Sequence, residues 1–269
     1  MSSLRPPERV NVLGVGISSL NLESAVSFLV QASQEKGNTG YVTVTGVHGV
    51  VESQHDPELK RIHNRSLLST PDGMPMVWVG RQRGQSNMGR VYGPELMLEV
   101  SKESLARGLT HYYFGGAEGV AETLKLKLQE RFGGLEVLGT FCPPFRPLNE
   151  EEEEAFVAEI QKARPHFLWI GLSTPKQERF MDQFLREHPD LTKDWDHSLI
   201  LLGVGAAFDF HTGRVRQAPR FIQRSGFEWL FRLCCDPKRL LKRYAYGNSF
   251  FLSRIFPQLL GWKSYPMSR

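Results

Sequence analysis

The stretch Ser69-Thr70-Pro71-Asp72-Gly73-Met74-Pro75 sets an acid between a proline and a glycine, directly after the short apolar run Leu67-Leu68. Residues 76–80 follow as the next buried segment. In an α/β domain, side chains just beyond the carboxyl ends of strands line the ligand crevice, so Asp72 is a candidate catalytic base. Pro-Asp-Gly is also typical of an ordinary turn in which the aspartate bonds its own backbone. The stretch alone leaves both interpretations open.

Outward from this stretch, predicted strands alternate with predicted helices from residue 9 to about residue 210. Two helices begin with clear caps: Asp56 precedes Pro57, and Asn149 precedes the acids 150–154. The alternation predicts an α/β fold with a mostly parallel, doubly wound, Rossmann-like sheet. Strands are expected at 9–17, 41–45, 110–114, 136–141, 167–172 and 199–204, and helices include 21–34, 93–108 and 120–132.

Composition limits the class of protein. The 269 residues are 41% hydrophobic and 23% charged, as in soluble globular proteins. Residues 1–9 lack an apolar signal core, and no stretch reaches the roughly 20 apolar residues of a spanning helix. Cys142, Cys234 and Cys235 have neither a metal-ligand nor a disulfide spacing. We therefore expect a cytoplasmic protein and predict no metal site.

The net charge of +4 is unevenly placed. After residue 210 many Lys and Arg residues face only the acids Glu228 and Asp236. An α/β catalytic domain over 1–210 and a basic, helical C-terminal appendage over 211–269 are predicted. Aromatic residues interleaved with the basic ones favour contact with an anionic membrane surface. There are two alternatives. The segment is a helix packed on the core with a solvated basic face, or it is a nucleic-acid-binding surface.

A glycine-rich turn follows the strand expected at 110–114. Gly115 and Gly116 open it, and such a turn can lay backbone N–H groups against a phosphate. The turn lacks the full dinucleotide fingerprint, so the glycines also fit a purely structural role in a tight turn.

Two later strand ends carry further candidates. Gln177 lies at a strand-to-helix junction on the same expected crevice as Asp72. A capping box with Thr174 as N-cap and Pro175 at the first helical position would explain Gln177 structurally. Asp209 follows the strand at 199–204, where it fits either a bond to a ribose or base edge or a turn cap.

Ordered sequence blocks run along nearly the whole chain, at 12–15, 42–45, 71–74, 90–96, 114–116, 171–178, 203–210, 226–232 and 236–239. In these blocks the chain resembles the WecG/TagA/CpsF family, glycosyltransferase family 26, which makes bacterial surface polysaccharides and wall teichoic acid linkage units. Several blocks in order are more specific than any one of them.

The resemblance implies an inverting, metal-independent transferase without a cofactor or a nucleic-acid partner. It would move N-acetylmannosamine, its uronic acid or glucose from a UDP-sugar to a polyprenyl-diphosphate-linked saccharide, at the inner face of the cell membrane. Departing UDP gains negative charge, which needs a cation for stabilisation. The roles that the resemblance and this chemistry assign are a general base (Asp72), nucleotide-sugar pocket residues (Thr43, Thr45, Gln177, Asp209) and cations at the leaving group (Arg232, Arg239, Lys242, Arg243).

Two positions depart from the family's usual residues. Thr45 stands where asparagine is usual, and Gln217 stands where arginine is usual, which leaves the particular sugar open. Alternatives of other classes are a non-catalytic nucleotide- or nucleic-acid-binding module and a nicotinamide oxidoreductase. The oxidoreductase is disfavoured because no Gly-x-Gly-x-x-Gly follows the first strand. The sequence leaves the oligomeric state, a homo-oligomer included, undecided.

Overall fold

The computed structural model describes residues 4–267, apart from the side chains of Arg220, Arg224 and Arg239. The chain folds into two compact units. The first consists chiefly of Glu23–Val42 and Gly93–Val215, and the second of Pro6–Leu22, Thr43–Tyr92 and the chain from Arg216 onward. The C-terminal segment thus shares a unit with two earlier segments. A separate functional role for 211–269 stays a prediction.

The described residues form a six-stranded sheet with the strand order β4-β3-β8-β7-β5-β6, and a separate two-stranded sheet. β5 runs parallel to β6 and to β7, and β7 runs parallel to β8. The predicted mostly parallel, Rossmann-like α/β fold is therefore confirmed. The strands of the larger sheet are β3 (Gly40–Thr45), β4 (Leu68–Pro71), β5 (His111–Gly115), β6 (Val137–Phe141), β7 (Phe167–Gly171) and β8 (Ile200–Gly203).

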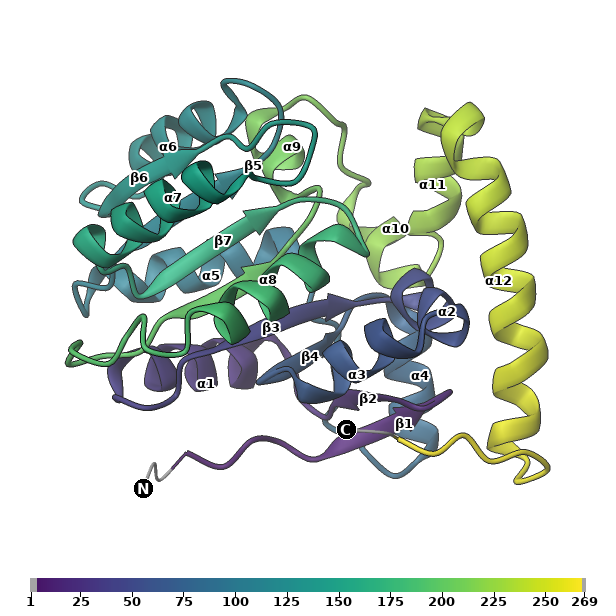
Figure 1. Ribbon diagram of the computed structural model, residues 1–269. Helices are drawn as coiled ribbons and strands as arrows, with labels where there is room; N and C mark the ends of the chain where they lie inside the picture. Colours follow the sequence, from purple (N-terminus) through teal and green to yellow (C-terminus); the bar gives the residue numbers. More distant parts are fainter. Residues whose placement is uncertain (1–3, 268–269) are drawn as a thin grey trace. The chain divides into compact units, whose positions relative to one another are not determined.

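Helices cover both faces of the strands in the first unit. In Figure 1, α7 and α8 lie in front of these strands and α5 lies behind them. Strands covered on both faces become continuous apolar runs, and accordingly Tyr112, Tyr113, Phe114 and Trp169 are buried. The helices of this unit are α1 (Leu22–Gln34), α5 (Gly93–Leu105), α6 (Val120–Arg131), α7 (Glu150–Ala163), α8 (Lys176–Glu187) and α9 (Ala207–Thr212).

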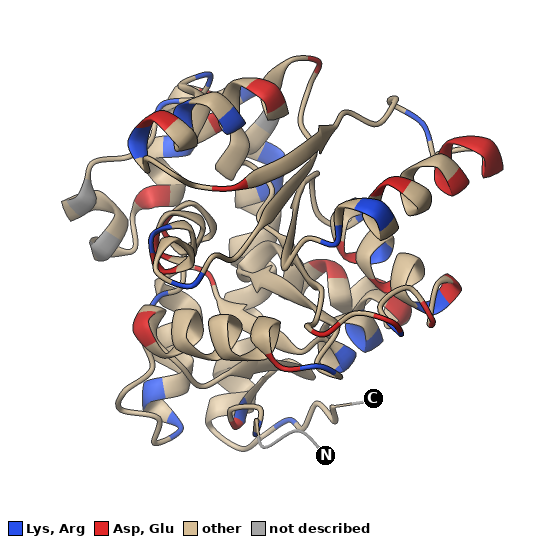
Figure 2. Ribbon diagram, turned by 90° about the vertical axis from the view of Figure 1, so that its left-hand side faces the viewer, with Lys and Arg blue, Asp and Glu red and all other residues tan. Residues whose placement is uncertain are grey.

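The start of α7 confirms the predicted cap. Asn149 accepts a hydrogen bond from the Glu152 backbone N–H, and the Glu152 side chain accepts one from the Asn149 N–H. The acids of the first turn gather at this end of the helix, as Figure 2 shows. They lie where the helix dipole stabilises negative charge.

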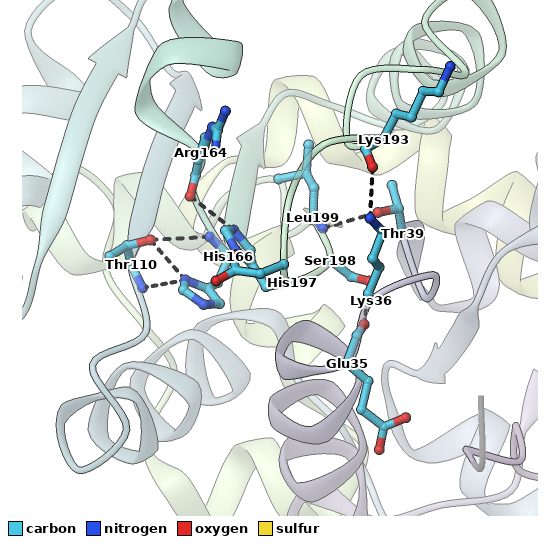
Figure 3. Close-up of polar contacts among 11 residues, drawn as sticks. Glu35, Lys36, Thr39, Thr110, Arg164, His166, Lys193, His197, Ser198 and Leu199 are labelled. Carbon is cyan, nitrogen blue, oxygen red and sulfur yellow. Dashed lines mark hydrogen bonds and ion pairs between the residues drawn. The ribbon is translucent and has the colours of Figure 1, made fainter. Parts of the chain in front are cut away.

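Hydrogen bonds tie together the segments at the amino ends of β3, β5, β7 and β8 (Figure 3). Thr110 Oγ1 lies 3.0 Å from His166 Nδ1, and His197 Nε2 lies 3.1 Å from the Arg164 carbonyl oxygen. Ser198 Oγ donates to the Glu35 carbonyl oxygen at 2.6 Å. The last two contacts satisfy the backbone carbonyl groups of Arg164 and Glu35. They leave the opposite, carboxyl ends of the strands as the place for a ligand.

In the second unit, the single strand expected at 9–17 is wrong. The segment forms an antiparallel hairpin of β1 (Arg9–Val12) and β2 (Val15–Ser18). Its two turn residues, Leu13 and Gly14, both have positive φ angles, of 51° and 84°, as a tight hairpin turn requires. Leucine gives no sequence signal for this conformation. Here Gln258 Oε1 accepts from the Leu13 N–H at 2.9 Å and holds the turn.

The helices of the second unit are α2 (Val47–His55), α3 (Pro57–Arg65), α4 (Met74–Gln82), α10 (Arg220–Ser225), α11 (Glu228–Cys235) and α12 (Pro237–Leu259). The predicted cap of α3 is confirmed, because Asp56 accepts from the Leu59 N–H at 3.0 Å. Along α12, Phe251 and Ile255 are buried with residues of the hairpin. No helix in residues 4–267 is long and apolar enough to cross a membrane.

Candidate active site

Asp72 lies directly after β4, in the turn that leads into α4. The φ angle of Gly73 is 90°, a conformation that favours glycine and turns the chain sharply into the helix. The Asp72 N–H donates to the Thr45 carbonyl oxygen at 3.0 Å, which ties the residue to the end of β3. About one third of the Asp72 side chain (33%) is exposed. The carboxylate is therefore held at the end of a strand and still reachable by a ligand.

Arg90 lies within ion-pair distance of Asp72. Its Nη2 lies 3.8 Å from Asp72 Oδ1 and makes a shorter contact with Glu228 Oε2 at the start of α11. Its Nη1 donates to the Gln223 carbonyl oxygen at 3.2 Å, and the guanidinium lies 4.1 Å from the centre of the Tyr92 ring. One guanidinium thus faces two carboxylates and is held by two further contacts.

These surroundings change the acidity of Asp72. Burial raises its pKa to about 6, even though Arg90 acts in the opposite direction. Glu228 raises the pKa further, whereas Arg232 and Arg243 lower it. A carboxylate with this pKa is ionised at neutral pH and is a stronger base than an ordinary aspartate. The site therefore carries a group suited to general-base catalysis.

Thr43 and Thr45, the predicted pocket residues of β3, are buried. Their hydroxyl oxygens lie 3.1 Å and 3.2 Å from His63 Nδ1, and Ser69 Oγ donates to Thr45 Oγ1 at 2.9 Å. Burial lowers the pKa of His63 to about 4, so the imidazole is neutral at neutral pH. Both threonine hydroxyls take part in an interior hydrogen-bond network beside Asp72, and their contact with a sugar stays a prediction.

The predicted cations of the C-terminal segment lie on two helices. Arg232 on α11 is half-buried, and Lys242 and Arg243 on α12 are exposed. Burial, with a smaller effect of Arg243, lowers the pKa of His48 at the start of α2 to about 4. Arg232 and Arg243 both act on Asp72, so the structure brings them into its electrostatic environment. The side chain of Arg239 lies outside the described residues.

In the first unit, Gly115 and Gly116 lie where β5 ends. The φ angle of Gly115 is 112°, and a Cβ there would lie 2.9 Å from the backbone of Gly171. The Gly116 N–H donates to the Gly171 carbonyl oxygen at 3.0 Å. Close approach of two strand ends therefore accounts for both glycines, and their contact with a phosphate stays a prediction.

The capping box expected at the start of α8 is wrong. The N-cap is Pro175, and no side chain caps the helix. The Ser173 carbonyl oxygen already accepts from the Gln177 N–H at 3.2 Å, so the backbone satisfies this group. Thr174 Oγ1 donates instead to Glu178 Oε1 at 2.8 Å.

Gln177 reaches the end of β8 instead. Its Nε2 donates to the Gly203 carbonyl oxygen at 3.3 Å and to Glu178 Oε1 at 3.1 Å. Its Oε1 is buried and has no hydrogen-bond partner among the described residues. An unpaired buried acceptor is costly, which marks Gln177 as a candidate ligand contact.

Asp209 lies inside the short helix α9 rather than in a loop. Its Oδ1 is 3.9 Å from Arg214 Nε, and its side chain is 39% exposed. The backbone N–H of Arg214 also donates to the Asp209 carbonyl oxygen. The carboxylate is open to solvent, and a bond to a ribose or base stays a prediction.

Sequence reasoning missed Arg90, Tyr92 and Glu228 as parts of the Asp72 site. All three lie inside the sequence blocks at 90–96 and 226–232, so those blocks marked the positions without giving them roles. A second signal was available. Glu228 is one of two acids in the strongly basic segment after residue 210, and this contrast in charge distinguishes it from its neighbours.

The Rossmann-like sheet, with a basic carboxylate and a paired guanidinium after β4, defines an α/β protein with an enzyme-like site. Among residues 4–267, no group of three or more His, Cys, Asp or Glu side chains is arranged to hold a metal ion. The model of the glycosyl transferase WecG/TagA/CpsF family matches residues 10–265, nearly the whole chain. The chain belongs to this glycosyltransferase family, and the resemblance seen in its sequence blocks is confirmed.

Proposed function

We propose that this protein is an inverting UDP-sugar hexosyltransferase whose acceptor is a polyprenyl-diphosphate-linked saccharide. The observation that carries the proposal is Asp72 itself: a partly exposed carboxylate at a strand end, with a pKa of about 6, in a chain of a glycosyltransferase family. The donor sugar is N-acetylmannosamine, its uronic acid or glucose.

In the proposed reaction, an acceptor hydroxyl attacks the anomeric carbon from the face opposite UDP. Asp72 takes the hydroxyl proton as the new C–O bond forms. The bond between the anomeric carbon and the UDP oxygen breaks, and UDP leaves with the electron pair. The anomeric configuration is inverted. Arg232, Arg239, Lys242 and Arg243 stabilise the charge on the diphosphate, so no metal is needed in this scheme.

The donor-binding residues of the first unit are Gly115, Gly116, Gln177 and Asp209. Gln177 has the clearest support, because its buried Oε1 has no hydrogen-bond partner among the described residues and can accept from an N–H or hydroxyl group of the nucleotide sugar. In the second unit, Thr43 and Thr45 are the further pocket residues of the proposal, and the Thr45 carbonyl oxygen accepts from the Asp72 N–H.

Binding to the cytoplasmic face of an anionic membrane is the second part of the proposal. Leu252, Phe256 and Leu260 recur at helical spacing along and just beyond α12, and about half or more of each side chain is exposed. Trp262 is 78% exposed. Lys242 and Arg243 lie exposed on the same helix, and basic residues beside apolar ones are typical of helices that lie in a membrane surface.

The experiment is a panel of UDP-sugars with a polyprenyl-diphosphate-linked saccharide acceptor, read by released UDP and by the mass of the product. We expect transfer from one of the three named sugars, undiminished by EDTA. A parallel thermal-shift comparison should show stabilisation by UDP and not by NAD. Loss of transfer in EDTA would refute the metal-independent scheme, and stabilisation by NAD alone would favour an oxidoreductase.

Membrane binding is tested by co-sedimentation with vesicles containing phosphatidylglycerol. The variant Phe256→Ser/Leu260→Ser should bind weakly, because it removes exposed apolar area and leaves the buried Phe251 and Ile255 in place. The control is Leu126→Ser, which changes a leucine that is 68% exposed in the first unit. Equal binding by the two variants and the unchanged protein would argue against this surface.

A further inference from the structure

Two carboxylates compete for the guanidinium of Arg90. Its Nη2 is in direct contact with Glu228 Oε2, whereas Asp72 Oδ1 lies 3.8 Å away, beyond hydrogen-bond length. Only 12% of the Arg90 side chain and 13% of the Glu228 side chain are exposed. Solvent screens such a pair less than an exposed one. The cation that could neutralise Asp72 is thus already paired with another acid.

Arg90 is also prevented from turning toward Asp72. Its Nη1 donates to the Gln223 carbonyl oxygen, and its guanidinium carbon lies over the Tyr92 ring. Glu228 completes this set from the first turn of α11. Among the described residues, the carboxylates that pair with Arg90 are those of Glu228 and Asp72.

We infer that Glu228 is a positioning residue, which keeps Arg90 from pairing fully with Asp72 and so preserves Asp72 as a base. This inference rests on the proposed role of Asp72. Glu228 touches no reacting atom in this scheme. Its effect on catalysis passes through Arg90 and through its own charge beside Asp72.

The other charged and titratable groups around Asp72 do not replace Glu228. Arg90 and Tyr92 face it from the segment after α4, Arg232 from α11 and Arg243 from α12. The arginines lower the pKa of Asp72, and burial keeps the Tyr92 hydroxyl protonated. Glu228 is the acid among these groups that raises the pKa of Asp72. Without its charge, Arg90 has Asp72 as its nearest anion.

The test follows the carboxyl ¹³Cγ signal of Asp72 in the full chain, assigned with Asp72→Asn, through a pH titration by NMR. In the unchanged protein the signal should titrate near pH 6. In Glu228→Gln, which keeps the shape of the side chain, the midpoint should fall by about one pH unit or more, because Asp72 loses a nearby like charge and Arg90 loses its competing anion, and nearby charges shift a carboxyl pKa by this much. Glu228→Asp should restore part of the shift.

The matched control is Glu58→Gln. Glu58 pairs with Arg61 and Arg65 in the same unit, and those exposed pairs are absent from the surroundings of Asp72. The Asp72 midpoint should not change in this variant. An unchanged midpoint in Glu228→Gln would overturn the inference. So would an equally large shift from Glu228→Gln in an Arg90→Met background, because Glu228 would then not act through Arg90.

Activity separates this inference from the proposed function. If the Asp72 midpoint falls in Glu228→Gln, the acid limb of kcat/KM against pH should move down with it, and the plateau should fall by about threefold to tenfold because the base is weaker. The Asp72 titration midpoint could fall while the acid limb of kcat/KM stays in place. That result would support the positioning role of Glu228 and refute Asp72 as the base. A midpoint that stays in place refutes the positioning alone.

Discussion

Two regions of the molecule depend on different physical properties: the carboxyl ends of β5 and β7, and the turn after β4. At the ends of β5 and β7, small residues let backbones meet: Gly115 lies against Gly171, and the Gly116 N–H is bonded across to it. In the turn after β4, side chains carry opposed charges around Asp72. The first region depends on shape and the second on charge. A substitution that adds one methyl group should therefore damage the first, and one that removes one charge should damage the second.

The largest expected effect is the loss of transfer in Asp72→Asn. An amide cannot accept the acceptor's proton as a carboxylate does, so kcat should fall by about 10²–10⁴-fold. UDP affinity, measured by calorimetry, should be unchanged. The control is Asp196→Asn, the same replacement at a side chain that is 98% exposed. If Asp72→Asn transferred the sugar at the normal rate, Asp72 would not be the base.

Gly115→Ala tests the dependence on shape. The new Cβ would meet the Gly171 backbone at 2.9 Å, at a φ angle of 112° that disfavours alanine. We expect a loss of about 3 kcal/mol in the free energy of unfolding, measured with urea and no ligand present. Gly133→Ala is the control, because a Cβ there meets nothing within 4 Å. Similar stability of the two variants would mean that the strand ends are not tightly packed.

The smallest expected effect is that of Gln177→Leu. This variant tests whether the Gln177 side chain stabilises the fold or binds a ligand. The change removes two hydrogen bonds and also an unpaired buried acceptor, so stability should fall by less than about 1 kcal/mol. UDP or UDP-sugar binding should weaken about tenfold, the value of one good hydrogen bond. Gln183→Leu, at an exposed position of the same helix, should change neither. If Gln177→Leu bound the ligand as tightly as the unchanged protein, the role of Gln177 would be structural only.

The sequence was most informative where local chemistry decides the structure. The caps at Asp56 and Asn149 and the apolar strands 167–172 and 199–204 were predicted close to their observed positions. The hairpin at 9–18 was missed because a positive φ angle at Leu13 depends on Gln258, far along the chain. The cap of α8 was misassigned because a backbone carbonyl took the role given to Thr174.

In the candidate site, too, local patterns were predicted and contacts between distant residues were not. Asp72 was found because a strand followed by Pro-Asp-Gly is a local pattern. The pairing of Asp72 with Arg90 was not predicted. The position of Arg90 depends on Glu228, which lies more than a hundred residues away in the sequence. Likewise, the burial that sets the acidity of Asp72 is a property of the folded unit and not of the stretch itself.

Asp72 is the proposed base, and its ionisation can be followed through activity in the unchanged protein. The pKa of Asp72 in the free protein is about 6, so kcat/KM should report it. Measured with UDP-sugar donor and lipid-diphosphate acceptor, kcat/KM should rise about tenfold per pH unit below that value and level off above it. A profile without a bend near pH 6, whether flat or bending only near the ordinary aspartate pKa of about 4, would contradict the claim.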